Sequence, residues 1–310
     1  MRVIFMGTPD FAVGTLEAIL AAGHEVALVV TQPDKPKGRG NAVHFSPVKE
    51  CAVAHDLLVY QPKRIREPES VEYLRGFAAD IAVVVAFGQI LPKSILEMPK
   101  YGCVNVHASL LPKYRGAAPI QWAIINGEEI TGVTTQRMDE GIDTGDVIAK
   151  RELRIAEDET GGSLFDKLAA LGAKLCVETM EMLEKGTAVF IPQDHEKSTH
   201  TSMITKELGD LDWSRPAAAL ERLVRGLDPW PSAYTYLGSK TFKIWKSGVL
   251  LEDSKATPGT VVRADKTGIY VQTGEGQLVL KEVQLEGKKR MDAAAFVNGS
   301  HITEGTVLCS

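Results

Sequence analysis

Short apolar runs alternate with amphipathic segments along the first third of the chain. The runs are rich in valine and isoleucine, as buried strands are, and they cover residues 2–6, 25–30, 57–60, 80–87 and 103–106. The segments between them have apolar residues at helical spacing and cover residues 9–23, 46–56 and 68–79. This alternation predicts a mainly parallel sheet with helices on both faces, which is a Rossmann-like, doubly wound α/β fold.

The ends of two of these helices can be placed from single residues. Ser46 is a good N-cap, and Pro47 follows it at the first helical position, where a missing N–H costs nothing. Gly23 is expected to end the first helix, because glycine readily adopts the left-handed conformation with which helices often end.

The pattern changes in the middle of the chain. Residues 129–155 alternate like two paired antiparallel strands, and residues 161–186 form one long amphipathic helical pattern. We expect a first domain over residues 1–187. Residues 188–208 contain Pro192 and many serine, threonine and histidine residues without sustained periodicity, so they are expected to be a linker.

The remaining residues, 209–310, have the pattern of a second and smaller domain. A helical pattern at 215–227 is followed by several short strand patterns separated by turn residues, at 232–237, 241–251, 259–265, 268–285 and 305–308. Such a series predicts a small antiparallel, OB-like β-barrel.

The composition is that of an ordinary globular protein. The chain has 310 residues, of which 44% are hydrophobic and 24% charged. No run approaches the roughly 18 apolar residues that cross a bilayer, and no cleavage site follows the first strand, so we expect a cytoplasmic protein without a membrane partner. The four cysteines form no C-x-x-C pair, so their spacing predicts neither a metal site nor a disulfide framework.

The charge is unevenly distributed. The net charge is −5; residues 1–208 carry 28 acidic and 22 basic residues, whereas residues 209–310 carry 12 and 13. The run "KPKGRG" at residues 35–40 nevertheless lies in the acidic part. Any contact with nucleic acid is therefore expected to be local rather than spread over the whole surface.

The stretch "NVHASLLPKYRGAAP" at residues 105–119 concentrates chemically useful groups. Side chains alternate along a strand, so Asn105 and His107 should lie on one face, at the carboxyl end where parallel sheets bind ligands. The turn "MDEGIDTGDV" offers four acidic residues, one of which could reach the imidazole. Taken singly, His107 could instead be a structural histidine, and the acidic turn a solvated hairpin loop.

Together, these two motifs resemble the folate-dependent formyltransferase family. The order Asn, His, SLLP, RG and a later D-x-G-x-D-T-G turn is far more specific than a single glycine pattern. The stretches "MGTPDFA", "TQPDKPKGRG", "FGQILP" and "LDPWPSAYTYL" extend the resemblance over essentially the whole chain, toward members that act on charged tRNA. The resemblance implies transfer of a formyl group from 10-formyltetrahydrofolate to the amino group of methionine on initiator tRNA, for translation initiation.

The resemblance places the catalytic set on Asn105, His107 and Asp143. Attack of an amine on a formyl group makes the formyl oxygen negative and requires a proton to leave the nitrogen. Asn105 would donate a hydrogen bond to that oxygen, and His107 would donate or shuttle a proton. Asp143 would fix the imidazole tautomer and help to remove the amine proton.

The resemblance also implies a set of folate contacts. They are Phe87, Gly88, Gln89, Ile90, Leu91, Ser109, Leu110, Leu111, Pro112 and Asp139, with Ile90 and Leu91 flanking the pterin ring. Without the resemblance, residues 86–92 could equally be a buried loop that caps a helix. No G-x-S-x-G elbow surrounds Ser109, so it is expected to shape the pocket and not to act as a nucleophile.

RNA contacts are expected from the basic loop and from the second domain. The expected residues are Lys35, Lys37, Arg39 and Lys206, although the basic loop could also be an ordinary solvated surface loop. Further lysines and arginines of the barrel are candidate phosphate contacts. Trp230 is expected to pack at the domain junction and not to stack on a base.

The sequence excludes some ligands and leaves two alternative functions open. The glycine spacing matches neither a P-loop nor a dinucleotide fingerprint, so NAD and ATP are not expected as ligands, and no metal is expected. A related formyltransferase that uses a nucleotide sugar, or a formyl-folate hydrolase, is the alternative enzyme. A non-catalytic folate-binding or RNA-binding module is the alternative outside catalysis. We expect a monomer.

Overall fold

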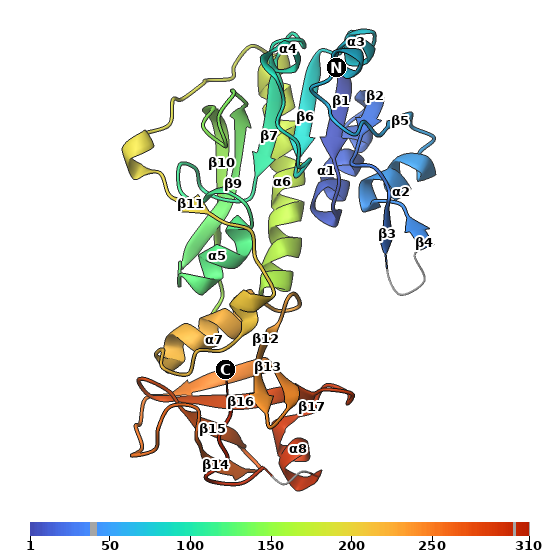
Figure 1. Ribbon diagram of the computed structural model, residues 1–310. Coiled ribbons are helices and arrows are strands. Elements are labelled where there is room, and N and C mark those ends of the chain that lie inside the picture. The colour runs from blue at the N-terminus through green and yellow to red at the C-terminus, as the bar shows by residue number, and fades with distance from the viewer. Residues whose placement is uncertain (38–41, 300–301, 310) are drawn as a thin grey trace. The chain divides into compact units, whose positions relative to one another are not determined.

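The computed structural model describes residues 1–37, 42–299 and 302–309, drawn as a ribbon in Figure 1. The chain divides into two compact units, and each is built from more than one stretch of sequence. Unit 1 contains Met1–Pro119, Ile130–Arg154 and Phe165–Thr201, and unit 2 contains Ile120–Glu129, Ile155–Leu164 and Ser202–Ser310. The two units are described in turn.

Unit 1 is built on a seven-stranded sheet (Figure 1). Its strand order is β10-β9-β7-β6-β1-β2-β5. The five strands from β7 to β5 are parallel, and β9 and β10 form an antiparallel pair at one edge. The strands are β1 (Arg2–Gly7), β2 (Glu25–Val30), β5 (Val59–Tyr60), β6 (Ile81–Val85), β7 (Cys103–His107), β9 (Ile130–Arg137) and β10 (Asp146–Arg154). The prediction of a mainly parallel, Rossmann-like sheet is confirmed.

Helices cover both faces of this sheet. They are α1 (Asp10–Ala21), α2 (Pro47–Ala54), α3 (Pro68–Arg75), α4 (Lys93–Leu96) and α6 (Gly161–Glu184). The predicted start of α2 is confirmed, because the Ser46 hydroxyl accepts a hydrogen bond from the backbone N–H of Lys49. None of the helices in the described part of the chain combines the length and apolar character needed to cross a membrane.

Successive side chains along each strand point to opposite faces of the sheet, so the core has one layer on each face. On one face, Ile4 and Met6 of β1 pack in a buried cluster with Leu74 of α3 and Ile95 of α4. On the other face, Gly172 lets α6 approach the sheet closely, because a Cβ at this position would lie 3.0 Å from Val106 Cγ1. The two layers fix the orientation of β7, which carries Asn105 and His107.

Short elements complete unit 1. A two-stranded hairpin joins β3 (Lys35–Lys37) to β4 (Ala42–His44). The segment expected as a linker contributes to unit 1 as far as Thr201. Ile191 pairs with Val147, and β11 (His200–Thr201) pairs with β8 (Arg115–Gly116), with η1 (His195–Lys197) between them.

Unit 2 is a small antiparallel β domain, as the sequence predicted. Its sheet has the order β12-β13-β16-β15-β14, with β17 beside β16. Its elements are α5 (Pro119–Ile125), η2 (Glu207–Gly209), α7 (Ala217–Gly226), β12 (Ala233–Leu237), β13 (Lys240–Leu250), β14 (Val261–Asp265), β15 (Gly268–Gln272), β16 (Gln277–Leu285), β17 (Met291–Asp292) and α8 (Ala293–Gly299). The alanine-rich helix α8 was not predicted from the sequence.

The last described residues close this sheet on itself. Val307 forms a bridge with Thr260, which immediately precedes β14, and Cys309 forms a bridge with Tyr236 of β12. These residues therefore form bridges at both edges of the sheet, beside β14 and on β12. Inside, the rings of Phe242 and Phe296 pack with centroids 5.1 Å apart.

Candidate active site

Asn105 and His107 lie on one face of β7, near its carboxyl end. Cys103, two residues before Asn105, belongs to the buried cluster beneath α3 and α4, so the strand alternation places all three residues on that face. Asn105 and His107 are both buried. The core therefore fixes the position of two polar side chains at the edge of the sheet where ligands collect.

Asp143 is the centre of the polar cluster. Its Oδ1 accepts hydrogen bonds from Asn105 Nδ2, at 3.3 Å, and from Gln136 Nε2, at 3.0 Å. Its Oδ2 accepts a hydrogen bond from the backbone N–H of Gly116, at 2.8 Å, and lies 3.6 Å from His107 Nδ1. Strands β7 and β9 and the loop after β7 thus converge on one carboxylate.

The tautomer of His107 is set by a backbone group that the sequence did not indicate. His107 Nε2 lies 2.8 Å from the carbonyl oxygen of Tyr114, which can only accept a hydrogen bond, so Nε2 carries the proton. Nδ1 is left facing Asp143. The sequence had assigned control of the tautomer to Asp143, and the geometry assigns it to Tyr114.

Several residues around this cluster have strained backbone conformations. Four non-glycine residues near it have positive φ values: Ala86 at 48°, Tyr114 at 59°, Ala118 at 54° and Asp143 at 53°. A non-glycine residue in this region costs free energy, and such residues cluster at functional sites. Asp143 is thus held in a conformation that the surrounding structure has to enforce.

Gln193 and Arg115 support the cluster, and the sequence reasoning did not select either. Gln193 Nε2 donates to the backbone carbonyls of Asp143, at 2.8 Å, and Gly145, at 2.7 Å. Gln193 Oε1 accepts from Arg115 Nη2, at 2.8 Å, and Arg115 is itself 2% exposed. The only available signal was the arginine in "YRG", because Gln193 lies in a segment without periodicity.

Several expected folate contacts have side chains inside the protein. Phe87, Leu91 and Leu111 are buried, so their side chains pack in the protein interior, and the expected contact of Leu91 with the ring stays a prediction. Gln89 Oε1 accepts from the backbone N–H of Ile65, and Ser109 Oγ donates to the Lys113 carbonyl at 2.6 Å. The side chains of Leu110 and Pro112 are partly buried, and Gly88 is exposed.

Two isoleucines near the cluster are exposed to an unusual degree. Ile90, which was expected as a folate contact, is 76% exposed, and Ile142, which was not, is 63% exposed. Ile142 directly precedes Asp143, in the turn where Asp139 Oδ1 accepts hydrogen bonds from Gly141 N and Thr144 Oγ1. An exposed apolar side chain in each of these two loops is suited to contact with an apolar ring.

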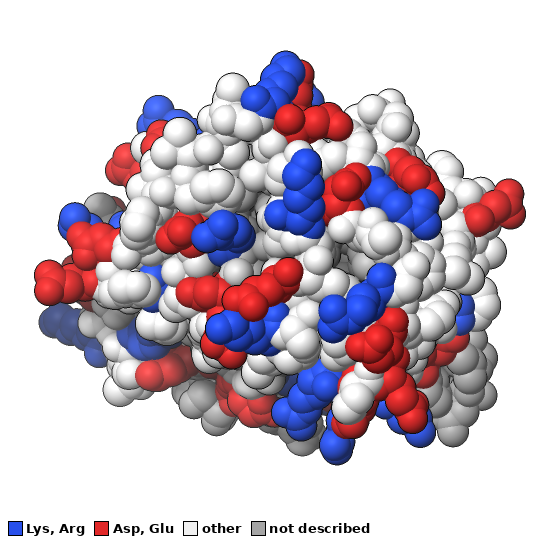
Figure 2. All heavy atoms as spheres, turned by 90° about the horizontal axis from the view of Figure 1, so that it is seen from above, with Lys and Arg blue, Asp and Glu red and all other residues white. Residues whose placement is uncertain are grey.

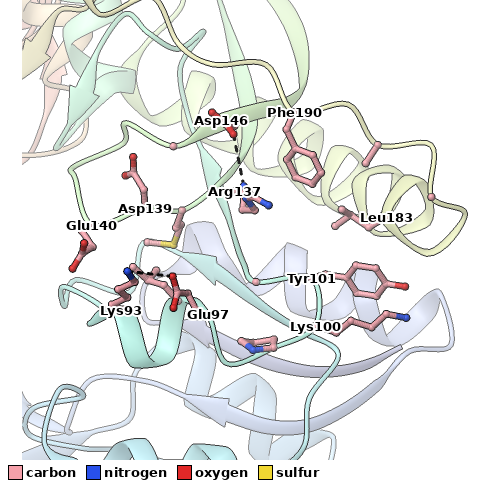
Figure 3. Close-up of a pocket in the computed structure, with 17 residues that line it drawn as sticks. Lys93, Glu97, Lys100, Tyr101, Arg137, Asp139, Glu140, Asp146, Leu183 and Phe190 are labelled. Carbon is pink, nitrogen blue, oxygen red and sulfur yellow. Dashed lines mark ion pairs between the residues drawn. The ribbon is translucent and has the colours of Figure 1, made fainter.

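A cavity of about 890 Å³ lies beside the same turn. Asp139 and Glu140 line it together with α4 and Phe190, and ion pairs join Lys93 to Glu97 and Arg137 to Asp146 (Figure 3). Of the described residues that line it, Asp139 alone was expected as a folate contact. The cavity is wide enough for a drug-sized ligand and has charges of both signs.

The expected RNA contacts lie on both units. Lys35 and Lys37 belong to β3, Arg39 lies outside the described residues, and Lys206 is exposed just before η2. Trp230 is 55% exposed, and its expected packing at the domain junction stays a prediction. On the face drawn in Figure 2, basic and acidic side chains are intermixed, so neither sign forms a continuous patch there.

Comparison with known sequences gives matches for both parts of the chain. A family described as "Formyl transferase" matches residues 1–180, and one described as "Formyl transferase, C-terminal domain" matches residues 203–301. A protein of Agathobacter rectalis named methionyl-tRNA formyltransferase is 67% identical over 306 residues, which cover 99% of each chain. The protein of that name from Lachnospira eligens is 55% identical, again over 99% of each chain.

Solved structures share the fold at low sequence identity. WlaRD, a sugar 3N-formyl transferase solved with dTDP and 5-N-formyl-THF, has a TM-score of 0.66 and 18% identity, and covers 93% of this chain and 99% of its own. HypX from Aquifex aeolicus, solved with tetrahydrofolic acid, has a TM-score of 0.62 and 19% identity, and covers 96% of this chain and 47% of its own.

Proposed function

The chain belongs to the formyl transferase family, and on that premise we propose that the cluster around Asp143 is the place where a formyl group passes to an amine. The enzyme formylates methionine carried on initiator tRNA, and relatives of the same length and high identity are named methionyl-tRNA formyltransferase. The observation that carries the site assignment is the convergence of Asn105 and His107 on one carboxylate.

Asn105 acts on the formyl oxygen. When the amine attacks, a carbon–nitrogen bond forms and the formyl oxygen gains negative charge, until the bond to the donor nitrogen breaks. A neutral amide held at a fixed position can donate a hydrogen bond to that oxygen without reorganising. The hydrogen bond from Asn105 Nδ2 to Asp143, at 3.3 Å, is long enough to be exchanged for a stronger one as the charge develops.

His107 and Asp143 handle the proton. The amine has to lose one proton, and the donor nitrogen has to gain one. Because Nε2 keeps its proton on the Tyr114 carbonyl, exchange takes place at Nδ1, on the side of Asp143. Asp143 accepts three hydrogen bonds, which hold its carboxylate in a fixed position beside Nδ1 of His107.

The formyl donor is derived from folate, and we infer that it is 10-formyltetrahydrofolate. The exposed side chains of Ile90 and Ile142 supply the apolar contacts that a planar ring needs, and they lie in the two loops that border the cluster. The donor brings the activated formyl group, and the protein orients it toward Asn105 and His107. The bound ring also excludes water from the cluster, which limits hydrolysis of the donor.

RNA binding is the proposed role of the remaining basic residues. Residues 1–187 would act as the catalytic domain, residues 188–208 as the connection, and residues 209–310 as the tRNA-binding barrel. Lys35, Lys37 and Arg39 would contact phosphates near the aminoacyl end, with Lys206 as a further contact. The cytoplasm is the proposed location of the reaction.

A comparison of acceptors tests this function. Transfer of labelled formyl from 10-formyltetrahydrofolate should be fast with initiator methionyl-tRNA and hardly measurable with free methionine or with a nucleotide-linked amino sugar. Faster transfer to the amino sugar would contradict the proposed acceptor while leaving the chemistry intact. Release of labelled formate without any acceptor would indicate a hydrolase.

A further inference from the structure

Three side chains with metal-binding atoms meet on helices α1 and α2, and none of them belongs to the site described above. They are Glu17 of α1, Cys51 of α2 and His55, which caps the carboxyl end of α2. Their ligand atoms all lie within 4.8 Å of one another. The cluster therefore combines a thiol, an imidazole and a carboxylate from two different helices.

The spacing on α2 is suited to binding one ion. Cys51 and His55 are four residues apart, so they project from the same side of the helix, which is how paired helical ligands hold zinc. In a tetrahedral zinc site the ligand atoms are about 3.3–3.6 Å apart, given the usual zinc–ligand distances. Glu17 is exposed and long, so a change of rotamer can bring its carboxylate to that distance.

The three groups are available for coordination. Glu17 and His55 are exposed, and Cys51 is partly buried and not in a disulfide. Within the part of the chain that the structure describes, no hydrogen bond or ion pair occupies the ligand atoms of these three side chains. Solvent can therefore reach the cluster and supply a water molecule as a fourth ligand.

We propose that Glu17, Cys51 and His55 form a binding site for a borderline-soft divalent cation, with zinc as the best match. A thiolate and an imidazole favour zinc over magnesium or calcium, which prefer sites made of oxygen ligands. Binding releases the thiol proton to solvent and forms a bond from Cys51 Sγ to the metal. The ion would join α1 to α2 and so stabilise the packing of the two helices.

The test uses the full-length, metal-free protein and cobalt(II) as a spectroscopic substitute for zinc. Cobalt should give a thiolate charge-transfer band that zinc then removes by displacement. Loss of a residue that merely supports a ligand already costs about 10–100-fold in metal affinity, so Cys51→Ser and His55→Gln should each weaken binding at least about tenfold. Glu17→Gln should weaken it as well, and Cys309→Ser and His44→Gln serve as matched controls that keep the native affinity.

A second measurement needs no variant. Zinc should slow alkylation of Cys51 by iodoacetamide, as located by peptide mass spectrometry, while the rate at the exposed Cys309 stays unchanged. Zinc should also raise the Tm of the native protein but not that of Cys51→Ser. The proposal is overturned if the native protein gives no thiolate band, if the three variants bind as tightly as the controls, or if zinc leaves Cys51 alkylation unchanged.

Discussion

The side-chain nitrogen Nε2 of Gln193 lies 2.8 Å from the backbone carbonyl oxygen of Asp143. This contact joins a segment without regular structure to the residue on which the proposed catalytic groups converge. Since Asp143 has a φ of 53°, an unfavourable value for a residue with a side chain, the turn needs such support to stay in place.

We expect Gln193→Ala to lower both activity and stability. A buried carbonyl group of Gly145 and a partly buried one of Asp143 would lose this donor, which costs about 1–3 kcal/mol of unfolding free energy, and Asp143 would lose its fixed position. Urea unfolding and kcat measure the two effects. Gln284→Ala, which removes an amide from unit 2, should leave kcat unchanged; an equal loss of kcat in both variants would show that the effect is not local.

Replacing any of the three proposed catalytic residues with alanine should lower kcat/KM by about 100-fold or more. The variants should remain folded, because the hydrogen bonds and ion pair of these side chains join them to one another, to Gln136 and to backbone groups of the same site. Circular dichroism and single-turnover formyl transfer together separate folding from chemistry. Near-normal turnover in a folded His107→Ala protein would refute the assignment.

Ile90→Ala and Ile142→Ala should each weaken binding of the folate donor by about fivefold, because each removes about 1 kcal/mol of apolar contact with the ring. Neither change should alter the stability much, since both side chains are exposed in the absence of ligand. Ile130→Ala, at a residue that is 49% exposed, is the matched control. Unchanged donor affinity in both loop variants would place the ring elsewhere, with the cavity beside Asp139 as the next candidate.

Neutralising Lys35, Lys37 and Arg39 together should weaken binding of methionyl-tRNA without changing donor affinity. Each lost phosphate contact should reduce the slope of log affinity against log salt by about 0.7–0.9. The control replaces the three basic residues of the similar run Lys63, Arg64 and Arg66 with glutamine. A slope that falls equally in both proteins would indicate a general charge effect and no specific contact by the loop.

Two aspartates in unit 2 should respond to pH in opposite ways. Burial raises the pKa of Asp210, whose Oδ1 has no hydrogen-bond partner among the described residues, so the charged form destabilises the fold. The protonated Asp210 side chain contributes to the free energy of unfolding below the ordinary aspartate pKa of about 3.9. This contribution is lost as the pH rises through the higher pKa that Asp210 has in the folded protein. Asp210→Asn should therefore raise the Tm at pH 7 and make little difference in acid.

Asp212 provides the contrast. Hydrogen bonds from the Ser214 side chain and backbone lower the pKa of Asp212, so its contribution to stability is present at neutral pH and is lost as pH falls through the lowered value. Asp212→Asn should lower the Tm at pH 7. The same sign of change in both variants would contradict the assignment of burial and hydrogen bonding as the opposing causes.

The sequence predicted the features that depend on local pattern. Apolar periodicity located the strands and helices of unit 1, Ser46 located the start of α2, and alternation along one strand related Asn105 to His107. These signals are contained in a few neighbouring residues, where side-chain direction follows from backbone geometry.

Contacts between distant residues were beyond such reasoning. Gln193 reaches Asp143 from a segment with no periodicity, and the Tyr114 carbonyl that orients His107 is a backbone group, which every residue has. The resemblance implied ring contacts for both Ile90 and Leu91, and only the structure shows that Leu91 is buried whereas Ile90 is exposed. The grouping of Glu17 with Cys51 likewise depends on how two helices pack.

Unit 2 takes in two short stretches, 120–129 and 155–164, that precede its main part in the sequence. Arg222 Nε donates to the Ile125 carbonyl at 3.3 Å, and Arg225 Nη1 donates to the Glu159 carbonyl at 2.8 Å, so α7 is bonded to both stretches. If the gene were divided once, between the family match that ends at residue 180 and the one that begins at residue 203, the second part would encode the barrel without residues 120–129 and 155–164. Exchange of the barrel among relatives by recombination would have to carry all three stretches together, so the two units are expected to have been inherited as one piece.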